Sequence, residues 1–300
     1  MTGRVQVGTA SWTDKTLISS KRFYPRGCSS AEDRLRYYAS QFPMVEVDSS
    51  YYAMPSMRNS MLWAERTPKG FTFNVKAFRL LTGHQTEAKS LPPAIAKEVQ
   101  GHFVSNRHIY YSDMPGELVD EMWRQFKGAL QPLRDAGKLG AVHFQFPPWV
   151  VPTQAWYAHI NECADRMAGW DISTEFRQER WFDGEHRAAT LDFERQLVAA
   201  HVIVDMPQGF KNSLPQIWEV TTPHRAIVRL HGRNRATWNV KGATAASDRF
   251  NYDYSDQELG ELASQIQLLR RQAELVQVVF NNNFEDQGQR NASTLQGMLL

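Results

Sequence analysis

Short runs that alternate apolar and polar residues recur along the whole chain, and longer stretches with helical periodicity separate them. Eight of these runs have the length and the β-branched or aromatic content of strands. They cover residues 5–9, 44–48, 71–76, 141–146, 171–176, 201–205, 226–231 and 276–281. Strands that alternate with helices are typical of parallel β-α units.

The stretches between the strands contain recognisable helix starts. Capping patterns occur at Ser29 with Glu32 or Ser30 with Asp33, at Ser56 before residues 57–66, and at Ser255 with Glu258. Residues 117–133 form the clearest long helix, because apolar residues recur on one face. Eight β-α units in 300 residues predict a single (β/α)8 TIM barrel, one domain spanning 1–300. Residues 77–116 and 232–254 are too long for simple loops, so we expect insertions after strands 3 and 7.

Period-two alternation assigns the two faces of each strand. One set is almost entirely apolar, which predicts that it faces outward beneath the helices: Val5, Val7, Val45, Val47, Phe71, Phe73, Val75, Val142, Phe144, Phe146, Ile172, Phe176, Val202, Val204, Val228, Leu230, Val276, Val278 and Phe280. The alternate set then points into the lumen and is strongly polar: Gln6, Glu46, Asp48, Thr72, Asn74, Lys76, His143, Gln145, Asp171, Ser173, Glu175, Arg177, His201, Asp205, Arg229, His231, Gln277 and Asn281. Barrel interiors are usually filled with branched apolar side chains, so this polarity needs a cause.

Charged members of the inward set gather at the carboxyl ends of the strands, where barrel enzymes place their chemistry. They are the carboxylates Glu46, Asp48, Glu175 and Asp205, the cations Lys76, Arg177 and Arg229, and His231. Buried charges must pair, bind an ion or face a wet pocket. Two interpretations are therefore open: a purely structural ion-pair network, or a functional site at the barrel mouth.

Composition narrows the class of protein only slightly. The net charge of +2 and the pI of about 8.5 are compatible with an anionic ligand and do not demand nucleic acid. Cys28 and Cys163 form neither a disulfide framework nor a zinc motif. We see no secretory signal and no apolar run of the roughly 18 residues that a membrane span needs. These features predict a cytoplasmic protein without a membrane partner.

Motifs at the strand ends resemble those of the YecE-like family, known as domain of unknown function 72. The matching segments, in order, are residues 8–12, 23–25, 46–52, 73–76, 145–147, 175–177, 205–207, 229–232, 280–282 and 291–292. The resemblance covers essentially the whole chain, and the ordered set is specific although each motif alone is weak. It implies a TIM-barrel fold and a mostly cytoplasmic bacterial protein, without an established activity.

Two positions depart from the pattern of that family. Ala10-Ser11 replaces the usual Ser-Gly, so the backbone freedom of the second glycine is lost. Asp48 replaces the usual asparagine of the second strand and adds a negative charge to the site.

Each candidate residue is assigned a role by its chemistry. Glu46 and Glu175 are the leading general acid/base candidates, with Asp205 and His231 as further catalytic candidates. Lys76, Arg177 and Arg229 suit a phosphate or carboxylate of the substrate. Neutral or aromatic side chains would orient the substrate or stack on it: Trp12, Tyr52, Gln145, Asn281 and Asn282. Asp48 is a further substrate-binding candidate. For each residue, structural pairing or packing remains the alternative.

Three functions are consistent with these residues. The first is an enzyme that uses carboxylate acid/base chemistry on a small anionic substrate, phosphorylated or sugar-like. The second is a metal-dependent nucleic-acid phosphoesterase, with a divalent metal held by Glu46, Asp48, Glu175, Asp205 and His231. The third is a non-catalytic anion-binding protein. We expect no cofactor, a divalent metal being the alternative, and the sequence does not predict an oligomeric state.

Overall fold

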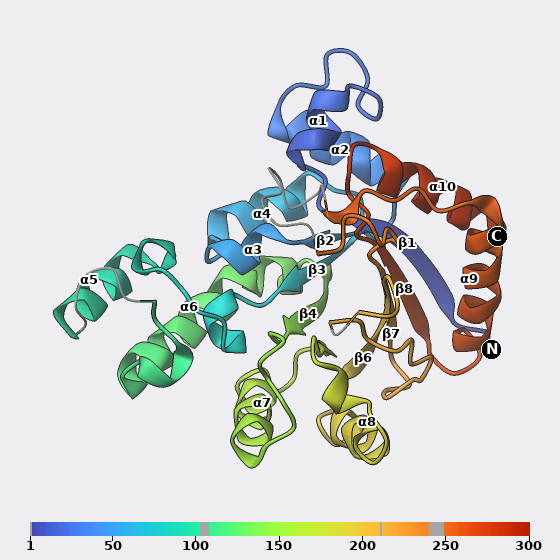
Figure 1. The fold of residues 1–300 in the computed structure, drawn as a ribbon. Coiled ribbons are helices and arrows are strands. Elements are labelled where there is room, and N and C mark those ends of the chain that lie inside the picture. Colours follow the sequence, from blue (N-terminus) through green and yellow to red (C-terminus); the bar gives the residue numbers. More distant parts are fainter. Residues whose placement is uncertain (1, 103–107, 211, 240–248) are drawn as a thin grey trace.

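Eight parallel strands close into a barrel in chain order in the computed structural model, which describes residues 2–102, 108–210, 212–239 and 249–300 (Figure 1). The strands are β1 (Arg4–Ala10), β2 (Met44–Val47), β3 (Thr72–Lys76), β4 (Leu139–Gln145), β5 (Ile172–Glu175), β6 (Ala200–Asp205), β7 (Ala226–Leu230) and β8 (Leu275–Phe280). The last strand pairs with the first, from Arg4 opposite Leu275 to Thr9 opposite Phe280. The (β/α)8 TIM-barrel prediction is confirmed.

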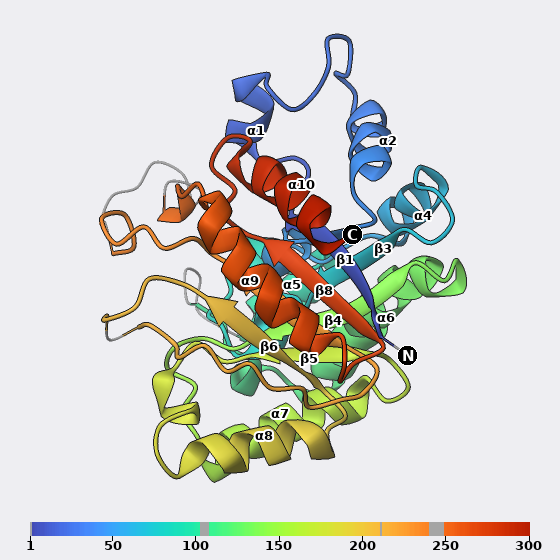
Figure 2. The same cartoon turned by 90° about the vertical axis from the view of Figure 1, so that its right-hand side faces the viewer.

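Helices surround the barrel, and three of them begin at predicted caps. They are α1 (Lys15–Ser20), α2 (Ala31–Gln41), α3 (Ser49–Tyr52), α4 (Met57–Glu65), α5 (Pro93–His102), α6 (Gly116–Asp135), α7 (Gln154–Arg166), α8 (His186–Gln196), α9 (Asp256–Leu269) and α10 (Gln287–Leu299). Ser30 and Asp33 form the capping box of α2, which decides between the two predicted starts. Ser56 caps α4, and Ser255 with Glu258 caps α9. In Figure 2, α9 and α10 lie over β8.

Both predicted insertions follow the carboxyl ends of their strands. The first contains the short 3-10 helices η1 (Arg79–Thr82), η2 (Ala88–Ser90) and η3 (Tyr111–Asp113) together with α5. A further 3-10 helix, η4 (Glu179–Trp181), follows β5. The described part of the second insertion is irregular, and residues 103–107 and 240–248 lie outside the described residues. The described residues between β6 and β7 form no helix. The connection between these two strands therefore lacks the helix that a (β/α)8 barrel is expected to have there.

The apolar core lies between the strands and the helices, as the alternation predicts. Outward side chains of all eight strands belong to one large buried cluster, with members such as Val45, Phe73, Phe144, Val228 and Phe280. Most of their inward neighbours are polar, and the apolar inward residues, such as Met44, Val279 and Ile227, form small separate clusters. At the amino-terminal end of the lumen, Gln277 links Gln6, Asn74 and Arg225 by hydrogen bonds of 2.7–3.0 Å. Mutual pairing of side-chain amides therefore satisfies this end of the lumen.

Strand β6 is the exception, and its predicted facing is wrong. Val202 and Val204 belong to a separate buried cluster with Ile227 on the inside, whereas Ile203 belongs to the outer core. His201 consequently points outward, where its Nδ1 lies 3.0 Å from Glu194 of α8. The outward face of β6 can carry polar residues because partners on neighbouring elements form hydrogen bonds and ion pairs with them. The alternation of apolar and polar residues along a strand does not reveal such partners.

Ser11 follows β1 with a backbone φ of 79°, in the left-handed region that favours glycine. This is the position where the family pattern has glycine, so the serine Cβ costs about 1–2 kcal/mol. Its Oγ accepts a hydrogen bond of 3.0 Å from the Thr13 amide, which offsets part of that cost. We expect Ser11→Gly to raise the free energy of unfolding by about 0.5–1 kcal/mol.

Denaturant unfolding measures this change. Ser264→Gly is the matched control, because Ser264 is exposed within α9 and glycine in a helix interior costs roughly 0.5–1 kcal/mol. A loss of stability in both variants would contradict the interpretation of Ser11.

Candidate functional site

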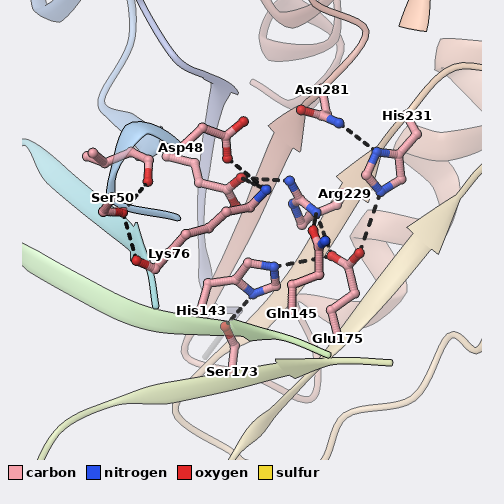
Figure 3. A network of polar contacts seen from close by, with 12 residues as sticks. Asp48, Ser50, Lys76, His143, Gln145, Ser173, Glu175, Arg229, His231 and Asn281 are labelled. Atoms are coloured by element: carbon pink, nitrogen blue, oxygen red, sulfur yellow. Dashed lines mark hydrogen bonds and ion pairs between the residues drawn. The ribbon is translucent and has the colours of Figure 1, made fainter. Parts of the chain in front are cut away.

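Arg229 of β7 is the centre of a buried charge cluster in the carboxyl-terminal half of the lumen. Its Nη2 lies 2.7 Å from Glu46 Oε1 of β2, and its Nη1 lies 2.6 Å from Glu175 Oε2 of β5. All three side chains are at most 1% exposed. One guanidinium therefore joins carboxylates from two strands that are not neighbours in the barrel, and its contact with Glu175 is drawn in Figure 3.

Glu175 is surrounded by groups that favour its ionised form. Besides Arg229, it contacts the Arg177 guanidinium and His143 Nε2, the latter at 3.2 Å. Burial opposes ionisation, but Arg177 and Arg229 outweigh it, so the pKa of Glu175 lies well below its usual range. Glu175 is therefore a fixed anion at neutral pH and is not suited to exchange protons there.

Glu46 has the opposite titration behaviour. Burial raises its pKa from 4.5 to about 7, an effect that Arg229 opposes and the neighbouring Asp48 reinforces. Lys76 Nζ lies 2.8 Å from Asp48 Oδ1 but 4.0 Å from Glu46 Oε1. The lysine therefore neutralises mainly Asp48. Although burial opposes ionisation there as well, Lys76 and Arg229 lower the pKa of Asp48 to about 2. Of these two adjacent carboxyls, Glu46 is the one that can change its protonation near neutral pH.

Two buried histidines complete the cluster in their neutral form. Burial lowers the pKa of His143 to about 4, although Glu175 opposes the effect. Burial and Arg177 place the pKa of His231 well below its usual range. His231 lies 2.7 Å from Asn281 Nδ2, a contact drawn in Figure 3, and 3.2 Å from Arg177 Nη2 on its other side. These contacts fix the orientation of the imidazole.

Cations outnumber ionised carboxylates at the mouth of the barrel. Arg79 of η1 lies 5.4 Å above the Tyr51 ring, and Lys76 Nζ lies 5.9 Å from the same ring. Arg177 is the third cation, with a side-chain exposure of 18%, compared with 11% for the more deeply buried Lys76. Among the described residues, no carboxylate forms a salt bridge with Arg79. The mouth therefore carries a positive excess, which favours an anionic ligand.

Nine of the thirteen sequence-predicted site residues lie together in this cluster. They are Glu46, Asp48, Lys76, Gln145, Glu175, Arg177, Arg229, His231 and Asn281. Their chemical roles stay predictions. The alternation missed His143 as a site residue although it placed this side chain inside the lumen, and its position one inward step before Gln145 was the available signal.

Asp205 does not join the cluster, which follows from the corrected facing of β6. Its carboxylate accepts hydrogen bonds from Arg233 Nε at 3.0 Å, from the Tyr254 hydroxyl at 2.5 Å and from the Gln216 amide. Asn282 is also separate, because its Nδ2 donates to the Tyr252 carbonyl and to Asn291. The side chains of Asp205 and Asn282 therefore connect segments of the chain by hydrogen bonds outside the lumen.

The two predicted aromatic contacts differ in their surroundings. Trp12 is buried and packs edge to face on Trp63 and Phe73, although it also lines a cavity of about 250 Å³ that Asp48 borders. Tyr52 is 57% exposed beside Tyr51, so its ring is available at the mouth.

The donors proposed for a metal are not brought together. Asp205 lies outside the lumen, and the other three carboxylates each face a cation. Among the described residues, no group of three or more histidine, cysteine, aspartate or glutamate side chains is arranged around a common point for a metal ion. This donor set does not fit the second function considered above.

Two further expectations concern the whole chain. Cys28 and Cys163 are both free thiols. None of the helices in the described part of the chain has the length and apolarity required to span a membrane.

These features define a class: a TIM-barrel protein whose lumen is closed, at the carboxyl ends of the strands, by a buried cluster of paired charges. The family described as "Protein of unknown function DUF72" matches residues 6–300. The chain belongs to the DUF72 family, which confirms the family that its strand-end motifs resemble.

Relatives of known sequence or structure extend over nearly the whole chain. The UPF0759 protein YunF of Bacillus subtilis (strain 168) is 31% identical over 281 residues, which are 93% of this chain and 89% of that protein. A DUF72 family protein of Enterococcus faecalis V583 superimposes with a TM-score of 0.79 at 25% identity, over 99% of this chain and 95% of the other. A DUF72 family protein of Thermotoga maritima MSB8 gives 0.74 at 25% identity, over 98% of both chains. These names specify no reaction.

Proposed function

We propose that this protein is an enzyme in which Glu46 acts as a general acid or base on a small anionic substrate bound at the barrel mouth. The observation that carries the proposal is that two neighbouring carboxyls, Glu46 and Asp48, have widely separated pKa values. Glu46 has a pKa of about 7, whereas burial of the neighbouring Asp48 is overcome by Lys76 and its pKa is about 2. Carboxyls whose environments separate their pKa values in this way are typical of acid/base sites.

The remaining charged groups support binding of an anion. The side chains of Lys76 and Arg177 are largely buried, but 11% and 18% of their surfaces remain exposed at the mouth, where a phosphate or carboxylate of the substrate can reach them. Arg229 is fully buried and positions Glu46, which it contacts at 2.7 Å. Glu175 in turn holds Arg177 and Arg229 in place. In this arrangement Glu175 is a positioning residue, and Glu46 is the proton-exchanging group.

A second candidate function is non-catalytic binding of the same class of anion. The positive excess supports it equally well, because a sensor needs the cations without the titrating carboxyl. The phosphoesterase alternative has less support, since the carboxylates it requires as metal ligands are separated or paired with cations.

Phosphate esters and organic carboxylates, screened singly with the purified protein, test the proposal. We expect at least one to raise the melting temperature and to yield a product detectable by mass spectrometry. Lys76→Met should weaken both effects, while Arg290→Met, a half-exposed arginine paired with Asp253, should leave them unchanged. Stabilisation without product favours the binding protein and contradicts the enzyme. Activity that is lost to a chelator would support the phosphoesterase instead.

A further inference from the structure

A second cavity lies beside the barrel mouth, between the segments that follow β3 and β4. It has a volume of about 330 Å³ and is lined mainly by rings. We call it the aromatic cleft and define it by Gly83, Tyr110, Tyr111, Trp149, Trp156 and His159. None of these residues takes part in the charge cluster.

Exposed aromatic side chains are concentrated on this face of the molecule. Among the described residues, the exposed aromatic side chains are Tyr52 at 57%, Trp149 at 47% and Tyr110 at 38%. They follow the carboxyl ends of β2, β4 and β3, respectively. Exposed large rings that gather at one mouth indicate contact with a ligand, because isolated surface packing would distribute them over the molecule.

Ring contacts connect the aromatic cleft to the cations of the mouth. Trp149 lies 5.7 Å from the His84 ring, and His84 lies 5.1 Å from the Tyr51 ring, centroid to centroid. Tyr51 in turn lies next to Lys76 and Arg79. Burial and Arg79 lower the pKa of His84 to about 3, so this link is uncharged at neutral pH. A continuous row of rings therefore links the aromatic cleft to the cations of the mouth.

The inner wall of the aromatic cleft is closely packed. Gly83 has a φ of 79°, and a Cβ at this position would lie 2.7 Å from the Trp156 ring. Trp156 also packs edge to face on His159 at 5.7 Å. The wall is therefore formed before a ligand arrives, which reduces the entropy lost on binding.

We propose that the aromatic cleft binds a planar aromatic or heteroaromatic ring of the same ligand whose anionic group binds at the barrel mouth. The proposal rests on the proposed function, because it assumes the anion site, and it narrows the substrate class to anionic aryl or heteroaryl compounds. Among the rings that line the aromatic cleft, Trp149 is the most exposed and therefore the most available for stacking.

Phenyl phosphate and ethyl phosphate form a charge-matched pair of probes for this proposal. Isothermal titration should give a Kd for phenyl phosphate at least about five-fold lower than that for ethyl phosphate. Trp149→Ala should reduce this ratio to near one without changing the Kd of ethyl phosphate. Leu268→Ala is the matched control, because Leu268 of α9 is also 47% exposed, and it should leave both constants unchanged.

The outcomes separate the two proposals. Equal binding of both phosphates by the unsubstituted protein overturns the aromatic cleft and leaves the anion site intact. A Trp149→Ala variant that weakens both probes to the same extent also overturns the aromatic cleft. If neither phosphate binds at millimolar concentration, the anion site of the proposed function fails, and the aromatic cleft fails with it.

Discussion

Glu46→Gln is expected to lower the turnover of the substrate by at least about 100-fold while leaving the fold intact. The reason is the environment of this carboxyl, which burial holds at a pKa of about 7 beside Arg229 and Asp48. Glutamine resembles the protonated acid in shape and can still accept the hydrogen bond from Arg229, but it cannot transfer a proton. The rate of the natural protein should also change around pH 7, and the variant should lack this inflection.

Unfolding experiments test the same titration without a substrate. A carboxyl with a raised pKa in the folded state stabilises the protein below its unfolded pKa, and this contribution is lost as the pH rises through the folded value. The stability of the natural protein relative to Glu46→Gln should therefore fall by about 3 kcal/mol between pH 4.5 and about pH 7.

The difference between the two proteins is the useful quantity, because buried histidines act in the opposite direction. His143, whose pKa burial lowers to about 4, destabilises the fold when the pH falls below its unfolded pKa. This contribution is common to both proteins and cancels. A difference that stays constant across this pH range would show that Glu46 does not titrate there, and full turnover in the variant would refute its catalytic role.

Arg229→Met should produce the largest loss of stability. Arg229 is fully buried, and it contacts Glu46 at 2.7 Å and Glu175 at 2.6 Å. Its removal leaves two carboxyls without their shared cation in the lumen. Loss of one partner from a buried pair typically costs about 3–5 kcal/mol, so we expect a decrease of that size in the free energy of unfolding.

Arg290→Met is the control for this measurement. Arg290 pairs with the exposed Asp253 at 2.9 Å and, at 3.4 Å, with Asp286, whose side chain is 9% exposed. The Arg290 side chain itself is 50% exposed, and pairs of exposed charges contribute about 0–1 kcal/mol. If Arg229→Met does not fold, Arg229→Lys, which keeps the charge, should recover soluble protein with reduced stability. Equal losses in Arg229→Met and Arg290→Met would contradict the central role of the cluster.

The fold could be predicted because its determinants are local. Alternation of apolar and polar residues located all eight strands, and caps such as Ser255 with Glu258 located helix starts. The cluster could be predicted for a related reason, since parallel strands in a barrel bring their carboxyl ends to one rim. Glu46, Lys76 and Arg229 therefore met although as many as 183 residues separate them along the chain.

The pattern could not predict which polar side chains would be bound by partners from distant parts of the sequence. Asp205 resembled a site residue because nothing near it in sequence indicated that Arg233 and Tyr254 would bind it outside the lumen. The sequence also could not predict the pKa values of the carboxyls. Glu46 and Glu175 were equivalent candidates until the number of cations around each was known. The aromatic cleft was missed because its rings follow different strands and share no periodicity.

Pairing of β1 with β8 has a consequence for the synthesis of this protein. Residues 4–9 find their partners only at residues 275–280, so the cylinder cannot close until nearly the whole polypeptide has been made. Until then, water can reach Arg229 and its carboxylates through the open side, and the cost of dehydrating them falls on the final step of folding. An open sheet that lacks β8 has two unpaired strand edges, and such edges can pair with other chains until the barrel closes.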